Sequence, residues 1–126
     1  MKKIITTPKA PAPIGPYNQA ILSGDTLYIS GQIPFNTETE TFILDDIKSE
    51  TAQVMTNLSA ILEAAEMTFE NVVKSSIFIS NMDDFAEINQ VYESYFNTAT
   101  APARETVQVA RLPKDVNVEI SMIAVK

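Results

Sequence analysis

The sequence predicts an α+β fold in which two helices cover one face of a mixed β-sheet, with the element order β-β-α-β-α-β-β. Two observations predict it: two segments carry apolar residues at helical spacing, and five short segments around them are rich in β-branched and aromatic residues. The 126 residues, 45% of them hydrophobic, suffice for a single domain over residues 1–126 with its own core. Because two helices cover only one face, the other face of the sheet must meet water or another subunit.

The N-terminal segment is expected to be irregular and to lead into a hairpin. It contains four prolines, which favour an extended and non-helical chain: Pro8, Pro11, Pro13 and Pro16. Ser23-Gly24-Asp25 is typical of a turn, so residues 17–22 and 26–30 are expected to pair as antiparallel strands.

Two amphipathic helices are expected, separated by a strand at residues 72–80. The first runs from about Asp46 to Glu66, because Asp45 and Asp46 are good N-caps for the apolar stripe that follows. That stripe consists of Ile47, Val54, Met55, Leu58, Ile61, Leu62 and Ala65, while Glu50, Gln53, Asn57 and Glu63 lie off it. Asp83 or Asp84 is expected to cap the second helix, whose apolar residues are Phe85, Ile88, Tyr92, Tyr95 and Phe96.

The C-terminal quarter is expected to form two antiparallel strands, residues 104–111 and 116–125, joined by a turn at residues 112–115. In the second strand the alternating residues Val116 to Ala124 are aliphatic and are assigned to the core. Paired across this turn, Arg104 would face Ile123 and lie on the order of 13 Å along the ladder from Glu119. We therefore expect these two residues to meet around a ligand only across neighbouring subunits.

Composition excludes several classes of site. The chain has no Cys, His or Trp, which excludes thiol nucleophiles, zinc fingers and triads with an imidazole base. The net charge of −7 disfavours sequence-independent binding of nucleic acid. No segment has the apolar length of a membrane span or a signal peptide, and no acidic cluster has EF-hand spacing. The expectation is a cytoplasmic protein.

Two charged residues are the candidates for chemistry. Glu119 belongs to a strand face that is half polar and half aliphatic, which suits a subunit interface with a polar site set in it. Arg104 stands where a loop passes into a strand and could clamp a carboxylate with two parallel hydrogen bonds. The plainer alternatives, an exposed strand glutamate and a surface arginine, stay open on pattern alone.

Four motifs together resemble one family. They are Ile14-Gly15-Pro16-Tyr17, Ser30-Gly31-Gln32-Ile33-Pro34, Pro102-Ala103-Arg104, and Val109-Ala110-Arg111-Leu112-Pro113-Lys114-Asp115 with Glu119-Ile120. Their order and spacing, over nearly the whole chain, are similar to those of the RidA (YjgF-like) proteins. The resemblance implies a chorismate-mutase-like α+β subunit and a homotrimer with ligand clefts between subunits. It also implies cofactor-free hydrolysis of 2-iminobutanoate and 2-iminopropanoate, imines released by pyridoxal-phosphate enzymes, to 2-oxo acids and ammonia.

The resemblance also implies roles for individual residues. It places the arginine that binds the substrate carboxylate at Arg104 and the glutamate that positions water at Glu119. The remaining positions that it implies line the cleft or donate backbone hydrogen bonds: Tyr17, Ser30, Gly31, Asn89 and Thr106.

The chain departs from the family pattern beside the arginine. Glu105 and Thr106 stand where many members carry Ser and Cys, which leaves the substrate preference open. Two other functions also stay open: a trimer that binds small 2-oxo or amino acids without turnover, and an RNA endonuclease that inhibits translation. The negative charge and the absence of histidine count against the second.

Overall fold

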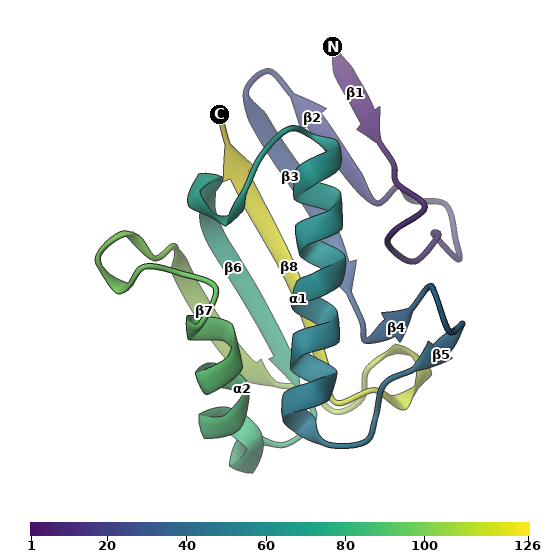
Figure 1. The fold of residues 1–126 in the computed structure, drawn as a ribbon, viewed down its shortest axis with the longest axis vertical. Helices are drawn as coiled ribbons and strands as arrows, with labels where there is room; N and C mark the ends of the chain where they lie inside the picture. The colour runs from purple at the N-terminus through teal and green to yellow at the C-terminus, as the bar shows by residue number, and fades with distance from the viewer.

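The computed structural model describes residues 1–126 and contains a six-stranded mixed sheet with the strand order β1-β2-β3-β8-β6-β7 (Figure 1). Its strands are β1 (Lys2–Ile5), β2 (Ala20–Ser23), β3 (Thr26–Gln32), β6 (Val72–Ile79), β7 (Ala103–Gln108) and β8 (Val118–Val125). All neighbours are antiparallel except β6 and β7, which are parallel. A two-stranded ribbon of β4 (Phe35–Asn36) and β5 (Thr41–Phe42) precedes the first helix. The predicted α+β class is confirmed.

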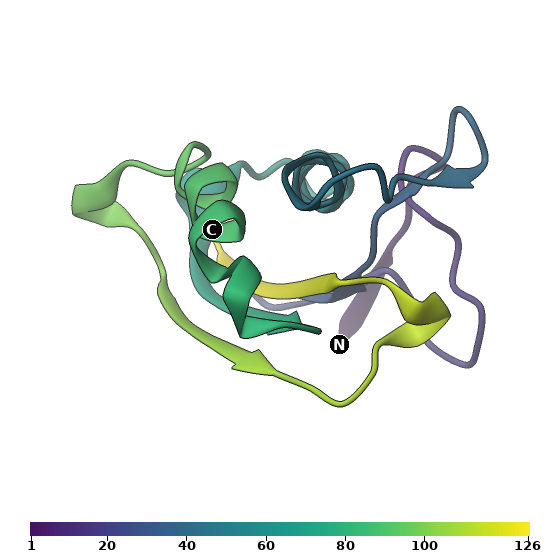
Figure 2. The same ribbon diagram turned by 90° about the horizontal axis from the view of Figure 1, so that it is seen from below.

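Both helices, α1 (Ile47–Ala64) and α2 (Phe85–Glu93), lie on the same face of the sheet (Figure 2). Asp46 caps α1 as expected, since its carboxylate accepts a hydrogen bond from the Ser49 N–H at 2.8 Å. Asp84, one of the two residues predicted, stands at the N-cap of α2, but its side chain makes no capping hydrogen bond. A 3₁₀ turn runs directly into α2, and the side chain of Asn81 caps that turn instead by accepting from the Asp83 N–H. Neither helix is long and apolar enough to cross a membrane.

The hydrophobic core lies between the helices and the sheet. It comprises 21 buried residues, contributed mainly by α1 and the central strands. The alternating residues assigned to the core of β8 are buried as predicted, with Val118, Ile120 and Ala124 fully so. Two polar residues that lie off the apolar stripe of α1 are buried nevertheless, since Glu50 and Asn57 are each only 1% exposed. Both are buried because they bind backbone groups of neighbouring loops.

The predicted C-terminal hairpin is wrong, and with it the register that placed Arg104 opposite Ile123. β8 lies between β3 and β6, whereas β7 lies at the sheet edge, parallel to β6, with Arg104 opposite Ser75. The reason is burial: β8 has one fully apolar face, which favours the sheet centre, while the polar β7 is exposed along most of its length.

The N-terminus also differs from the expectation. Residues before the first proline form β1, which pairs with β2 from Lys2 opposite Ser23 to Ile5 opposite Ala20. The predicted hairpin of β2 and β3 is confirmed, although β2 begins at Ala20 rather than near Tyr17.

Candidate functional site

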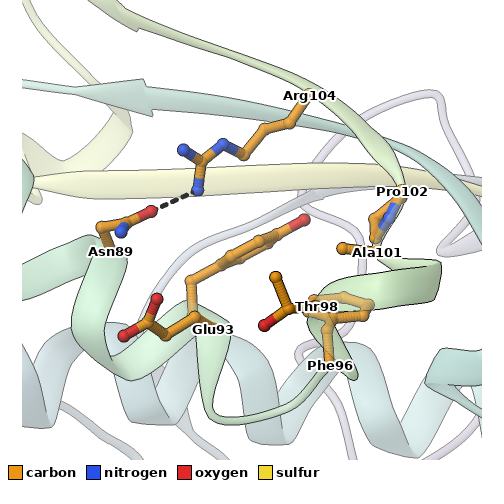
Figure 3. A pocket seen from close by; sticks show the side chains of 8 residues that line it. Asn89, Glu93, Phe96, Thr98, Ala101, Pro102 and Arg104 are labelled. Atoms are coloured by element: carbon orange, nitrogen blue, oxygen red, sulfur yellow. Dashed lines mark hydrogen bonds between the residues drawn. The ribbon is translucent and has the colours of Figure 1, made fainter.

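Arg104 projects from β7 toward α2, where three residues hold its guanidinium group. Its Nη1 donates a hydrogen bond to Oδ1 of Asn89 at 2.6 Å (Figure 3). The guanidinium carbon lies 5.1 Å from the ring centre of Tyr92 and 5.7 Å from that of Phe85. These contacts orient the planar group through one amide bond and two cation–π interactions, and leave its other N–H donors available to an anion.

A cavity of about 270 Å³ lies beside this arginine. It is lined by Asn89, Tyr92, Glu93, Phe96, Thr98, Ala101, Pro102 and Arg104 (Figure 3). The hydroxyl of Tyr92 donates to Oγ of Ser75 at 2.8 Å, and burial raises the pKa of Tyr92. Tyr92 is thus a neutral, fixed wall beneath the guanidinium group.

Glu119 lies in a different and larger cavity, of about 580 Å³. Its lining is Pro11, Ala12, Ile14, Tyr17, Gln19, Gly31, Gln32, Ile33, Phe35, Phe42, Pro113, Lys114 and Glu119. The carboxylate is half-buried, and this burial raises the pKa of Glu119 above its ordinary value. A glutamate in such a place accepts and returns a proton closer to neutral pH than an exposed one does.

Gly31 makes room for the side chain of Glu119 in the conformation that the structure shows. A Cβ atom at position 31 would stand 2.5 Å from Oε2 of Glu119 and 2.8 Å from its Cδ, which is closer than van der Waals contact allows. Position 31 lies in the irregular stretch between Ile29 and Gln32, where the pairing of β3 with β8 shifts register. The glycine thus makes room for the carboxylate beside its backbone.

Buried amides, which the sequence analysis missed, hold the walls of the Glu119 cavity. The side chain of Gln19 accepts from the Thr7 N–H at 2.7 Å and donates to the carbonyls of Ala10 at 3.1 Å and Pro11 at 2.9 Å. Asn57 of α1 donates to two carbonyls of the segment that follows β3, both at 3.0 Å. The only signal for Asn57 in the sequence is a polar residue at one edge of the apolar stripe.

Of the remaining predicted residues, one lines the Glu119 cavity, one lies near Arg104 on β7, and one lines neither cavity. Tyr17 lines the Glu119 cavity and its hydroxyl accepts from the Ile14 N–H at 3.4 Å. Ser30 lines neither cavity, because its hydroxyl donates to the Asn18 carbonyl at 2.6 Å. Thr106 follows Arg104 by two residues on the same face of β7, and its buried hydroxyl oxygen has no partner in the chain. Glu105 points the other way, to the open face, where it pairs with Lys74 at 2.9 Å and with Ser76.

The predicted site residues of one chain therefore fall in two separate cavities. Tyr17, Gly31 and Glu119 share one cavity, Asn89 and Arg104 share the other, and no residue lines both. Strand alternation puts Arg104 on the helix-covered face and Glu119 on the open face of the sheet. No three acidic side chains gather as a metal ion would require.

The comparisons with known proteins agree with this architecture. The family described as Endoribonuclease L-PSP matches residues 7–126. A RutC family protein of Synechocystis sp. is 51% identical over 124 residues, covering 98% of this chain and 95% of the relative. A 2-iminobutanoate/2-iminopropanoate deaminase of Dermatophagoides farinae is 48% identical, covering 98% and 96%. The crystal structure of Escherichia coli TdcF with bound serine superposes with a TM-score of 0.92 at 42% identity, covering 98% of each chain.

The fold defines a small α+β protein of the chorismate-mutase-like class, with charged groups set in two surface cavities. The chain belongs to the RidA/YjgF/RutC family.

Proposed function

We propose that this protein is an imine deaminase, which hydrolyses 2-imino acids such as 2-iminobutanoate and 2-iminopropanoate to 2-oxo acids and ammonia. The observation that carries the proposal is the half-buried carboxylate of Glu119, whose raised pKa suits a group that accepts and returns a proton. Full-length relatives named 2-iminobutanoate/2-iminopropanoate deaminase, 44–48% identical to this chain, support the same reaction. We place the activity in the cytoplasm, where pyridoxal-phosphate enzymes release such imines.

In this proposal Arg104 binds the substrate carboxylate. Its fork of N–H donors fits a carboxylate with two parallel hydrogen bonds, and Asn89 together with the ring of Tyr92 fixes the plane of the fork. Thr106, on the same face of β7, contributes a backbone N–H or its unpartnered hydroxyl to the same ligand. Binding at the carboxylate leaves the imine carbon free to face Glu119.

Glu119 orients the attacking water. A protonated imine is already a strong electrophile, so the reaction needs a positioned water and a proton acceptor. The water oxygen bonds to the imine carbon and its proton passes to the carboxylate. The same proton is then delivered to the nitrogen. As the C–N bond breaks, the hydroxyl oxygen forms the C=O bond of the 2-oxo acid and gives its proton to the carboxylate, and ammonia leaves. That proton then passes from Glu119 to the ammonia or to solvent, which restores the carboxylate. Tyr17 and the backbone of Gly31 line the space where this occurs.

A homotrimer completes the site in our proposal. Arg104 and Glu119 line cavities on opposite faces of the sheet, so a second copy of the chain must bring one to the other. The open sheet face carries exposed apolar side chains, including Tyr28 at 51% exposure and Val73 at 49%, which a neighbouring copy would cover.

A coupled assay tests the activity and the two charged residues. An amino-acid oxidase generates the imine, semicarbazide traps it, and the protein competes for it. We expect wild type to suppress trapping. In Arg104→Ala and Glu119→Ala the rate of imine deamination should fall about a hundredfold or more, because one loses a charge-assisted double hydrogen bond and the other a catalytic base. Arg104→Lys, which keeps the charge without the fork, should fall in between. Glu70→Gln, at an exposed position, is the matched control and should equal wild type.

Binding without turnover is the second candidate, and the bound serine in the TdcF structure favours it. Both functions predict that 2-oxobutanoate binds in calorimetry and that Arg104→Ala abolishes binding. Only the deaminase predicts loss of the imine faster than in buffer. The endoribonuclease named in the family description is disfavoured by the net charge of −7; cleavage of single-stranded RNA by wild type but not by Glu119→Ala would revive it.

A further inference from the structure

Glu50, in the first turn of α1, is a buried carboxylate that no lysine or arginine neutralises. It is 1% exposed, and none of the three ion pairs of the chain includes it. A charge in such a place is costly unless hydrogen bonds compensate it. The compensation comes from two sources: the positive end of the α1 dipole and three N–H donors from the start of β8.

The three donors belong to two consecutive residues. Oε2 of Glu50 accepts from the backbone N–H of Asn117 at 2.5 Å and of Val118 at 3.2 Å, while Oε1 accepts from Nδ2 of Asn117 at 2.9 Å. The pairing of β3 with β8 extends no further than Ile120. β3 therefore offers no carbonyl to the backbone N–H groups of Asn117 and Val118, and the Glu50 carboxylate accepts their hydrogen bonds instead.

Asn117 extends the connection to the end of β6. Its side-chain oxygen accepts from the Ser80 hydroxyl at 2.8 Å, and its carbonyl accepts from the Ser80 N–H at 3.0 Å. Glu50 thus joins α1, β6 and the first residues of β8 into one rigid corner, and Glu119 follows immediately.

We propose that Glu50 is a positioning residue for Glu119: by holding the start of β8, it sets the direction in which the Glu119 carboxylate enters its cavity. The proposal rests on the deaminase function assigned above. It predicts an effect on turnover and none on binding, because neither Glu50 nor the residues that it holds line the Arg104 cavity.

Two substitutions separate hydrogen bonding from shape. In Glu50→Gln the amide oxygen accepts from both backbone N–H groups. Asn117 then turns its amide by 180° to present its oxygen to the new NH₂, and the Ser80 hydroxyl accepts from Asn117 instead of donating. Every group that contacts position 50 keeps a partner, and the hydroxyl hydrogen of the partly exposed Ser80 turns to water, so turnover should stay within about twofold of wild type. Glu50→Leu fills the space with no acceptor and should lower turnover about tenfold or more.

The experiment measures imine turnover per folded molecule and the Kd of 2-oxobutanoate by calorimetry, with circular dichroism as the check of folding. Reduced turnover with an unchanged Kd in Glu50→Leu, rescued in Glu50→Gln, supports the proposal. Wild-type turnover in folded Glu50→Leu, or equal loss in Glu50→Gln, overturns it. If Glu50→Leu does not fold, Glu50→Asp replaces it, because its shorter side chain cannot reach both backbone amides; wild-type turnover in that variant overturns the proposal as well. Absence of turnover in wild type would refute the deaminase instead.

Discussion

At the scale of single residues, the burial of Glu119 makes the stability of the protein depend on pH. Burial raises the pKa of Glu119 in the folded chain, so the folded chain binds this proton more tightly than the unfolded chain does. The contribution of this proton to the stability of the fold is therefore complete below the pKa that Glu119 has in the unfolded chain. It is lost as the pH rises through the higher pKa that Glu119 has in the folded chain. At neutral pH the charged carboxylate lowers the free energy of unfolding.

Glu119→Gln removes this charge and should stabilise the fold at neutral pH. We expect its Tm to exceed that of wild type by about 2–5 °C at pH 7 and to equal it at about pH 3.5, where both side chains are neutral. Thermal melts across this pH range measure the difference. A difference in Tm that stays constant with pH would show that the gain comes from packing and not from the charge. The same variant should be inactive, which would separate stability from function at one residue.

At the scale of secondary-structure elements, the sequence predicts the parts that depend on local periodicity. The spacing of apolar residues predicts each end of α1 to within two residues, and the alternation of residues in β8 predicts which face of that strand is buried. The position of β7 depends instead on competition with β8 for the centre of the sheet, which the strand with an apolar face occupies. Local periodicity does not predict this outcome, because it depends on distant segments. The roles of Glu50, Gln19 and Asn57 depend on backbone groups in distant segments, so helical spacing alone does not show that Glu50 and Asn57 are buried.

The N-terminal segment, which covers the Glu119 cavity, is held chiefly by one buried side chain. Gln19→Leu keeps the volume but leaves the Thr7 N–H and the Ala10 and Pro11 carbonyls without their partner. Each unpaired buried group of this kind lowers the free energy of unfolding by about 1–3 kcal/mol, so we expect a Tm lower by about 5 °C or more. Hydrogen exchange should quicken in residues 6–18 and stay unchanged in α1. Asn18→Ala, at the exposed neighbouring position, is the control and should match wild type; uniform acceleration would mean that Gln19 supports the whole core.

At the scale of the whole molecule, the proposed site between subunits predicts complementation between inactive variants. Arg104→Ala retains an intact Glu119 cavity, and Glu119→Ala retains an intact Arg104 cavity, because no residue lines both. If each site combines the Arg104 half of one subunit with the Glu119 half of the next, random mixing of equal amounts gives both intact halves in about a quarter of the sites. Co-refolding the two variants should therefore restore about a quarter of the wild-type imine turnover, while each variant refolded alone stays inactive.

The size of the assembly and its activity can be followed together during this experiment. Light scattering should give three times the mass of the 13.9 kDa chain for wild type and for the mixture. If activity returns only in material with the mass of a trimer, catalysis depends on the interface between subunits. A mixture that assembles but stays inactive would place both residues in a site within one chain, and would require the sheet edge at β7 to move relative to β8. The two cavities on opposite faces of the sheet favour the first result.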